Sequence, residues 1–211
     1  MTDLTHPLER LVQRAELLMA RIEAALPQPL SAPDWSASIA FRYRKRSNGR
    51  GGLEPVRHVA SLGLNDLQEI DGQKEKIQRN TEQFVNGLPA NNVLLTGARG
   101  TGKSSLIKAC LNEYAPRGLR LIEVDKDDLT DLPDIIDMVS ERPEKFMIFC
   151  DDLSFEDGEP GYKALKSILD GSVAAATPNV LIYATSNRRH LLPEYMKENL
   201  TYTHTEDGEV H

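Results

Sequence analysis

The sequence lacks the features of a membrane or secreted protein. No apolar run approaches the roughly 18 residues of a membrane span. Asp3, Glu9 and Glu16 interrupt any basic-then-apolar signal pattern at the start of the chain. Hydrophobic residues make up 40% and charged residues 27%, which suits a globular protein with a real core. We therefore expect a cytoplasmic protein that makes no membrane contact.

Cysteine and histidine are scarce, with two and five residues respectively. Cys110 and Cys150 both lie in apolar stretches, so buried reduced thiols are favoured over a disulfide. The histidines have no metal-ligand spacing relative to the cysteines, and we therefore expect no zinc site.

Basic residues are outnumbered, and the net charge of −7 argues against a protein covered in nucleic acid. The charge is uneven, however, because residues 42–50 form a basic block and residues 123–137 are strongly acidic. The basic block fits a segment that contacts phosphates. It also fits the more common alternative of a solvated loop or β-ribbon face, and both interpretations stay open.

One octapeptide, residues 97–104, holds most of the functional information. It reads Gly-Ala-Arg-Gly-Thr-Gly-Lys-Ser and fits the phosphate-binding P-loop pattern G-x-x-x-x-G-K-[ST] without a mismatch. The apolar residues 93–96 predict a buried strand before it, and residues 105–111 predict a helix after it, which is the required context. A chance match is expected in on the order of one per cent of chains this long.

The positions of this loop have predicted roles in holding ATP. Its glycines let successive N–H groups turn toward phosphate oxygens, and the helix N-terminus adds positive partial charge. Lys103 is predicted to reach the β- and γ-phosphates, and Ser104 to ligate Mg²⁺. The predicted nucleotide-binding residues of the loop are Gly97, Ala98, Arg99, Gly100, Thr101, Gly102, Lys103, Ser104 and Ser105.

An apolar strand that ends in two acids follows the P-loop. Residues 146–150 are apolar, and Asp151 and Asp152 come directly after them. The carboxyl edge of such a buried strand is where open α/β folds bind their ligands. Asp151 is predicted to hold Mg²⁺, and Asp152 to orient or deprotonate the attacking water. The alternative is a strand that ends in two turn-forming aspartates.

A last apolar strand, residues 180–185, leads into the polar residues Ser186 and Asn187. An amide at the tip of a strand beside the acid-bearing strand can contact the γ-phosphate and help to place the water. Asn187 is the better candidate for this role, and Thr185 is the second.

The chain divides into three predicted parts. Residues 1–36 comprise an amphipathic helix at 7–26 and a proline-containing linker at 27–36. Residues 37–62 form a basic extended segment, in which apolar and basic residues alternate as they do in a strand or hairpin. Residues 63–211 begin with a helical segment and then alternate strand and helix, as a parallel α/β sheet requires. In this part the predicted strands are 93–96, 119–124, 146–150 and 180–185, and the predicted helices after residue 100 are 103–114, 132–141 and 161–170.

The N-terminal helix has an apolar seam about three heptads long. Its members recur at spacings of three and four: Leu8, Leu11, Ala15, Leu18, Ile22 and Ala25. The seam fits a helix packed against its own domain, which is the more common case, and it also fits a helix that pairs with another subunit.

These motifs, in this order and preceded by Ile70-Asp71-Gly72-Gln73, resemble an AAA+ ATPase core. The amino-acid sequence of residues 89–105 and 150–155 is similar to that of a bacterial AAA+ clade carried as a domain of unknown function. The resemblance covers about residues 40 to 211 and implies a three-layer P-loop NTPase fold with a parallel sheet in the order 5-1-4-3-2. It also implies that the segment around Ile70 lies against the adenine and that Asn187 is the residue called sensor 1.

Two departures from the family pattern bear on activity. Asp152 stands where most AAA+ proteins have Glu, which implies slow hydrolysis. No arginine follows Arg189, so we expect this chain to lack the arginine finger, the fifth strand and the helical lid with its sensor 2 arginine. The P-loop strand then becomes an edge of the sheet unless residues 37–43 cover it. We expect a C-terminally incomplete module with weak turnover.

Three functions are compatible with these features. The leading one is an ATPase that uses Mg²⁺, forms a homo-oligomer when complete, and remodels or loads an unknown protein or nucleic-acid client. Its predicted catalytic residues are Lys103, Asp152 and Asn187. The second is a binding module whose ATP and ADP states switch partner affinity with little turnover. A small-molecule kinase is less favoured, because neither an acceptor pocket nor an arginine-rich lid is evident.

Overall fold

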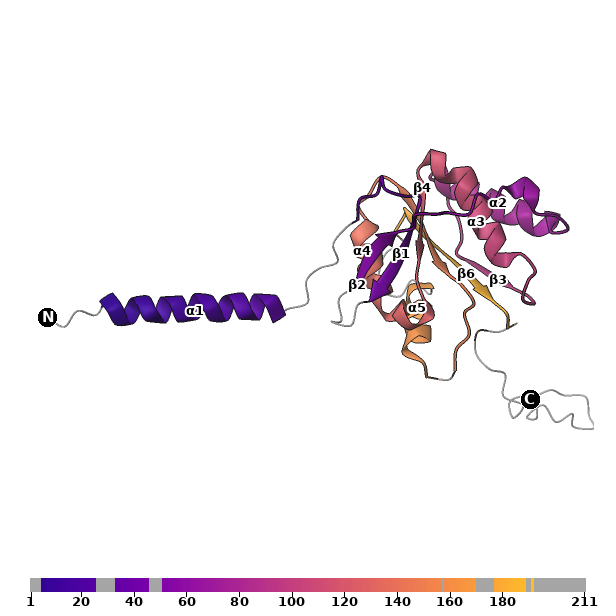
Figure 1. Ribbon diagram of the computed structural model, residues 1–211. Helices are drawn as coiled ribbons and strands as arrows, with labels where there is room; N and C mark the ends of the chain where they lie inside the picture. The colour runs from indigo at the N-terminus through magenta and orange to yellow at the C-terminus, as the bar shows by residue number, and fades with distance from the viewer. Residues whose placement is uncertain are drawn as a thin grey trace, which may run out of the picture.

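A computed structural model gives the fold of the protein (Figure 1). It describes residues 5–25, 33–45, 51–156, 158–169, 177–188 and 191. Six described strands form one sheet in the order β2-β1-β4-β5-β6-β3. The β1–β2 pair is antiparallel, and every other neighbouring pair is parallel.

The element bounds match the predicted pattern of alternating strands and helices. The strands are β1 (Ala40–Lys45), β2 (Gly51–Pro55), β3 (Val93–Thr96), β4 (Leu119–Glu123), β5 (Lys145–Cys150) and β6 (Val180–Ser186). The α-helices are α1 (Thr5–Ala25), α2 (Asp71–Val85), α3 (Lys103–Tyr114), α4 (Leu132–Val139) and α5 (Pro160–Leu169). Three short 3-10 helices are η1 (Leu64–Asp66), η2 (Ala115–Arg117) and η3 (Lys126–Asp131). From β3 onward, each predicted bound lies within two residues of the observed one.

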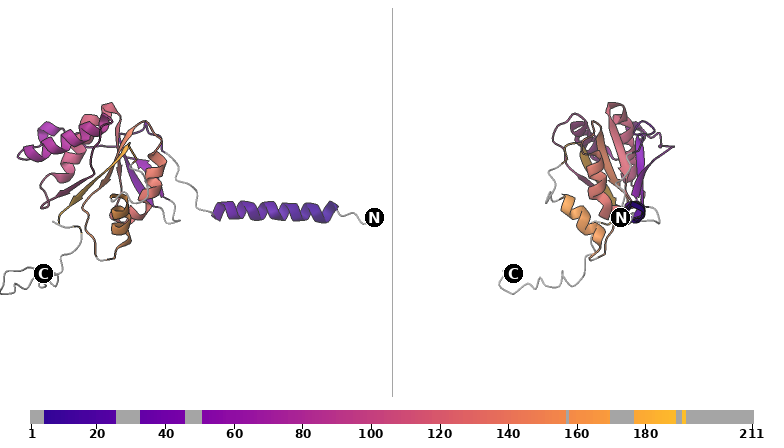
Figure 2. Two further views of the ribbon diagram at one scale, coloured as in Figure 1. Left: turned by 180° about the vertical axis from the view of Figure 1, so that it is seen from behind. Right: turned by 90° about the vertical axis from the view of Figure 1, so that its left-hand side faces the viewer.

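Helices cover both faces of the sheet, which confirms the predicted three-layer α/β class (Figures 1 and 2). Helices α2 and α3 pack on one face, and α4 and α5 pack on the other. Strand β5 lies between them, with Phe146 and Ile148 in one core and Met147 and Phe149 in the other. A strand buried on both faces carries apolar residues throughout, because successive side chains point to opposite sides.

The P-loop strand β3 pairs only with β6 among the described residues, so it forms one edge of the sheet. From that edge inward the order is P-loop strand, β6, β5 and β4, which corresponds to 1-4-3-2 in the family scheme. The suggestion that residues 37–43 cover the edge is wrong. Strand β1 instead pairs with β4 at the far side, with Ala40 opposite Leu121. The predicted polar tail after residue 191 lies outside the described residues.

The predicted hairpin is present, and the described part of the basic block lies on it. Arg42 donates two hydrogen bonds to Glu123, at 2.7 and 2.9 Å. Lys45 bonds both carboxylate oxygens of Asp131, at 2.9 and 3.1 Å. These pairs favour the β-ribbon interpretation over a free phosphate-contacting segment. Residues 46–50, the rest of the block, lie outside the described residues.

Helix α1 and the two cysteines agree with the predicted pattern in secondary structure and burial. The predicted N-terminal helix is present as α1, which stands apart from the α/β body (Figure 1). Of the predicted linker, only residues 33–36 are described. No described helix is both long and apolar enough to cross a membrane. Cys110 and Cys150 are buried without a disulfide, and burial raises the pKa of each thiol to about 12.

Tyr43 fastens the hairpin to the body. Its side chain is buried, and its hydroxyl donates to Asp131 at 2.8 Å. Burial raises the pKa of Tyr43, and the hydrogen bond to Asp131 raises it further. Gly51, on the neighbouring strand, leaves the space that this ring occupies.

A Cβ at residue 51 would lie 1.7 Å from the Tyr43 hydroxyl oxygen, whereas one at residue 52 would meet nothing within 4 Å. Gly51→Ala must therefore displace the ring from Asp131. We expect Gly51→Ala to lower the free energy of unfolding by about 1–3 kcal/mol. Gly52→Ala, its matched control, should change it by less than about 0.5 kcal/mol. Urea unfolding of both variants measures the difference, and equal losses would contradict this packing.

Candidate nucleotide-binding site

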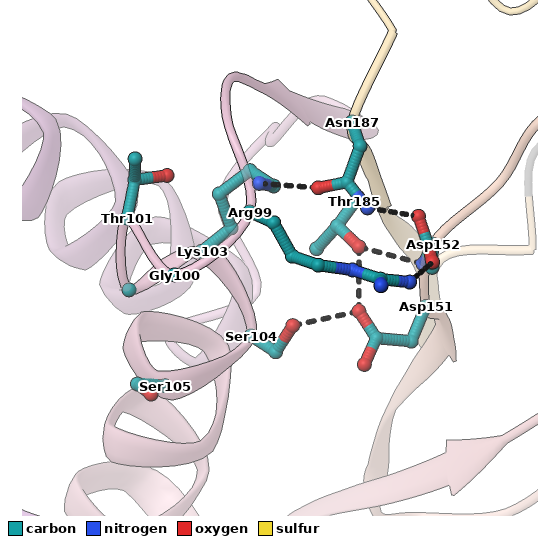
Figure 3. A pocket seen from close by; sticks show the side chains of 11 residues that line it. Arg99, Gly100, Thr101, Lys103, Ser104, Ser105, Asp151, Asp152, Thr185 and Asn187 are labelled. Carbon is teal, nitrogen blue, oxygen red and sulfur yellow. Dashed lines mark hydrogen bonds and ion pairs between the residues drawn. The ribbon is translucent and has the colours of Figure 1, made fainter.

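A cavity of about 270 Å³ opens at the carboxyl edge of β3, β5 and β6 (Figure 3). It is lined by Arg99, Gly100, Thr101, Gly102, Lys103, Ser104, Ser105, Asp151, Asp152, Thr185 and Asn187. The P-loop and the ends of β5 and β6 supply these residues from three separate parts of the sequence. Of the predicted site residues, only Ile70, Gly97 and Ala98 are not in the lining.

The P-loop has a backbone that requires glycine at its turns. Gly100 and Gly102 both have φ of +81°, in the left-handed region that side chains disfavour. Gly102 precedes the first residue of α3, and its carbonyl accepts the helical hydrogen bond of Leu106 at 2.9 Å. The first N–H groups of α3 have no partner within the helix and carry positive partial charge. This end of α3 is suited to bind a phosphate.

Lys103 connects the P-loop to the tip of β6. Its ammonium group donates to the carbonyls of Gly97 and Ala98, both at 2.7 Å, and to the Asn187 amide oxygen at 3.0 Å. Gly97 and Ala98 thus take part in the site through their backbone. Lys103 also lines the cavity, and its contact with phosphates stays a prediction.

The two predicted magnesium ligands lie side by side. Ser104 donates from its hydroxyl to Asp151 Oδ1 at 2.6 Å, and Thr185 donates to the same oxygen at 2.5 Å (Figure 3). Hydroxyl and carboxylate oxygens are the ligands that Mg²⁺ prefers, with water and phosphate in its other positions. The donor set therefore fits Mg²⁺. Among the described residues, no group of three or more His, Cys, Asp or Glu side chains could hold a metal.

Asp152 is held by three neighbours. Asn187 donates from its amide nitrogen to Oδ1, and Arg99 reaches Oδ2 at 3.2 Å from across the cavity (Figure 3). The Asp152 N–H donates to the Thr185 hydroxyl at 2.8 Å. Its φ of +53° is left-handed, a conformation that Asp tolerates better than most residues. The Arg99–Asp152 ion pair is exposed and adds little stability. The hydrogen bond from the Asp152 N–H to Thr185 therefore holds Asp152 more firmly than this ion pair does.

Thr185 has a larger part in this arrangement than sequence reasoning gave it. It is 1% exposed and bonds both aspartates through one hydroxyl, as donor to Asp151 and acceptor from Asp152. It is a positioning residue for the acids. The signal in the sequence was a hydroxyl residue at the end of an apolar strand, but its partners depend on how β5 and β6 align.

Ile70 lies beside the P-loop rather than in the cavity lining. It precedes α2, and its Cδ1 is 3.9 Å from where a Cβ on Gly102 would stand. Helix α2 is held to the sheet because the Tyr183 hydroxyl accepts a hydrogen bond from Asn80 at 2.9 Å and bonds Thr81 at 2.8 Å. The contact of Ile70 with adenine stays a prediction.

The chain is similar in sequence to one protein family and to part of a curated replication protein. The family described as "Protein of unknown function (DUF815)" matches residues 36–211. The replication factor C large subunit of Sulfolobus acidocaldarius is 40% identical over 92 residues, which are 42% of this chain and 20% of that protein. The chain thus spans about a fifth of the length of this curated relative.

Solved structures with a similar arrangement include those of DnaA and DnaI. AMPPCP-bound DnaA from Aquifex aeolicus is 18% identical, with a TM-score of 0.44, over 68% of this chain and 49% of that chain. DnaI is 24% identical, with a TM-score of 0.45, over 63% of this chain and 73% of that chain. The family match over residues 36–211 confirms the predicted resemblance to a family carried as a domain of unknown function.

Replacing the Thr185 hydroxyl should loosen both aspartates. Thr185→Val keeps the shape but removes the acceptor of the Asp152 N–H, so we expect the free energy of unfolding to fall by about 1–3 kcal/mol. Thr185→Ser keeps the hydroxyl and should lose less. Urea unfolding of the three proteins checks this. A Val variant as stable as the parent would mean that the hydroxyl does not hold the acids.

Proposed function

We propose that this chain, which belongs to the DUF815 family of proteins of unknown function, binds Mg·ATP at its P-loop and hydrolyses it slowly. One observation supports this above the others. Ser104, at the start of α3, lies 2.6 Å from Asp151, at the end of β5. Two predicted ligands that are far apart in the sequence therefore meet beside a P-loop, as a nucleotide site with a divalent cation requires.

Phosphate binding is assigned to the loop and to Lys103. The N–H groups at the start of α3 would bind phosphate oxygens, and the long side chain of Lys103 would exchange its carbonyl partners for phosphate oxygens. Its bond to Asn187 would then bring the amide of the proposed sensor 1 close to the terminal phosphate. Ile70 is proposed to border the adenine.

Magnesium is assigned to Ser104 and Asp151, with Thr185 holding the carboxylate in place. When bound, Mg²⁺ would offset the negative charge that develops during phosphoryl transfer. The protein's own part is to present the hydroxyl and carboxylate oxygens on one side of the cavity.

Water activation is assigned to Asp152, with Asn187 aligning it. Both carboxylate oxygens of Asp152 already have partners, Asn187 on one and Arg99 on the other. A water must displace or share one of these contacts before the carboxylate can accept its proton. Together with the short Asp side chain, this supports slow turnover.

The same contacts favour a second function, a binding module whose nucleotide state sets partner affinity with little turnover. In either case the client is proposed to be a protein or a nucleic acid. The 40% identity to a segment of replication factor C large subunit makes nucleic-acid-processing assemblies the first clients to test.

Lys103→Ala removes the cation of the phosphate site. A lost charge-assisted hydrogen bond is worth about 1.5–3 kcal/mol, so the Kd for Mg·ATP should rise about 10- to 100-fold. Lys108→Ala is the matched control, because Lys108 is exposed on the same helix and lies outside the cavity lining. Titration calorimetry measures both. Equal affinity in the parent and Lys103→Ala would rule out this site.

The two aspartates should separate binding from turnover. Asp151→Asn should weaken binding in Mg²⁺ while leaving the affinity in EDTA close to the parent's, because the metal loses a carboxylate. Asp152→Asn should bind Mg·ATP almost normally but lower phosphate release by about 10²-fold or more. Unchanged turnover in Asp152→Asn would contradict its role. Parental turnover no higher than that of Lys103→Ala, with binding intact, would support the binding module instead.

A further inference from the structure

Helix α1 presents apolar side chains that nothing in the described residues covers. Five large apolar residues on one side of it are 49–69% exposed: Leu11, Val12, Leu18, Met19 and Ile22. The helix stands apart from the α/β body in both figures (Figures 1 and 2). The expectation that the helix packs against its own domain is therefore wrong for these side chains.

The exposed apolar residues form one continuous stripe. An α-helix turns about 100° per residue, so these five residues and Ala15 between them fall within an arc of about 120°. This is wider than the narrow a/d seam of a minimal coiled coil. Leu17, which is exposed to the same extent as Leu18, lies about 100° away from it, outside the stripe.

Charged residues border the stripe with one sign on each side. Glu9 and Glu16, seven residues apart, run along one border, and Arg14 and Arg21, also seven apart, run along the other. No Glu of this helix stands three or four residues from an Arg, which is the spacing of helix-stabilising ion pairs. Because the acids and the bases lie on opposite borders of the stripe, the acids of one helix can meet the bases of another across an interface.

This segregation of charge favours a second copy of the same helix as the partner, and it favours one relative direction of the two helices. When two copies of such a helix pack in parallel, the acidic border of one faces the basic border of the other. In an antiparallel pair, like charges face each other. Helices that lie on membranes carry mainly Lys and Arg on the polar face, whereas the sequence of α1 as a whole has three Glu (9, 16 and 23) and three Arg (10, 14 and 21).

We propose that α1 joins copies of this chain by packing in parallel, in register, against α1 of a second copy. The stripe defined by Leu11, Val12, Ala15, Leu18, Met19 and Ile22 is the buried surface. The Glu and Arg borders fix the direction. This association does not depend on nucleotide binding.

The first test compares two neighbouring residues in the full chain. Leu17 and Leu18 are 59% and 58% exposed, but only Leu18 lies in the stripe. Sedimentation equilibrium should show the parent associating over roughly 1–100 μM, and Leu18→Asp should raise the midpoint concentration at least about tenfold. Leu17→Asp should leave it within about twofold. The thermal unfolding of the α/β body should be the same in all three, because the Leu17 and Leu18 side chains are exposed and do not pack on it.

The second test reverses the borders. Arg14→Glu with Arg21→Glu makes both borders acidic, and Glu9→Arg with Glu16→Arg makes both basic. In a parallel bundle each double variant alone should associate more weakly than the parent, and an equal mixture of the two should recover association. In an antiparallel bundle neither would weaken, since like charges already face each other there.

Several results would overturn the proposal. These are a parent that stays monomeric to about 100 μM, equal effects of the two Asp variants, or double variants that associate as well as the parent. Binding of a monomeric parent to vesicles with anionic lipid, lost in Leu18→Asp, would assign the stripe to a membrane surface instead.

Discussion

The hydroxyl of Thr185 joins the ends of the two strands on which the site depends. Through it the tip of β6 fixes both acids that follow β5, and through Asp151 it reaches Ser104 on α3. Lys103 closes the arrangement by bonding the P-loop carbonyls and Asn187. The three segments of the cavity are therefore connected through polar side chains, on a sheet whose central strand is buried on both faces.

The sequence was sufficient to predict those features that depend on residues close together in the chain. The P-loop needs its glycines and lysine in fixed order, and the apolar runs around it define β3, β5 and β6. What depends on strand alignment could not be read from the sequence. The pairing of Cys150 with Ala184 brings Thr185 to Asp151, and the pairing of Ala40 with Leu121 puts β1 at the edge opposite the P-loop strand. The Arg99–Asp152 contact spans 53 residues and has no local signal either.

Helix α1 and the α/β body follow different physical rules. The body buries its apolar residues in two cores, one on each face of the sheet. Helix α1 exposes its apolar residues and has no Glu–Arg pair at the spacing that stabilises isolated helices. Most helices of this length in water depend on packing for their stability. An interface between copies would supply that packing without altering the body.

Because β3 lies at the edge of the sheet, the P-loop and the two aspartates follow strands that differ in their number of neighbours. Among the described residues, β3 has a ladder of hydrogen bonds on one side only, whereas β5 is bonded on both. Segments with fewer bonds open at lower free energy and exchange their amide hydrogens sooner. The phosphate-binding loop therefore follows a strand that is bonded on one side, whereas the acids follow a strand that is bonded on both sides. The loop can adjust to its ligand while the carboxylates stay in register.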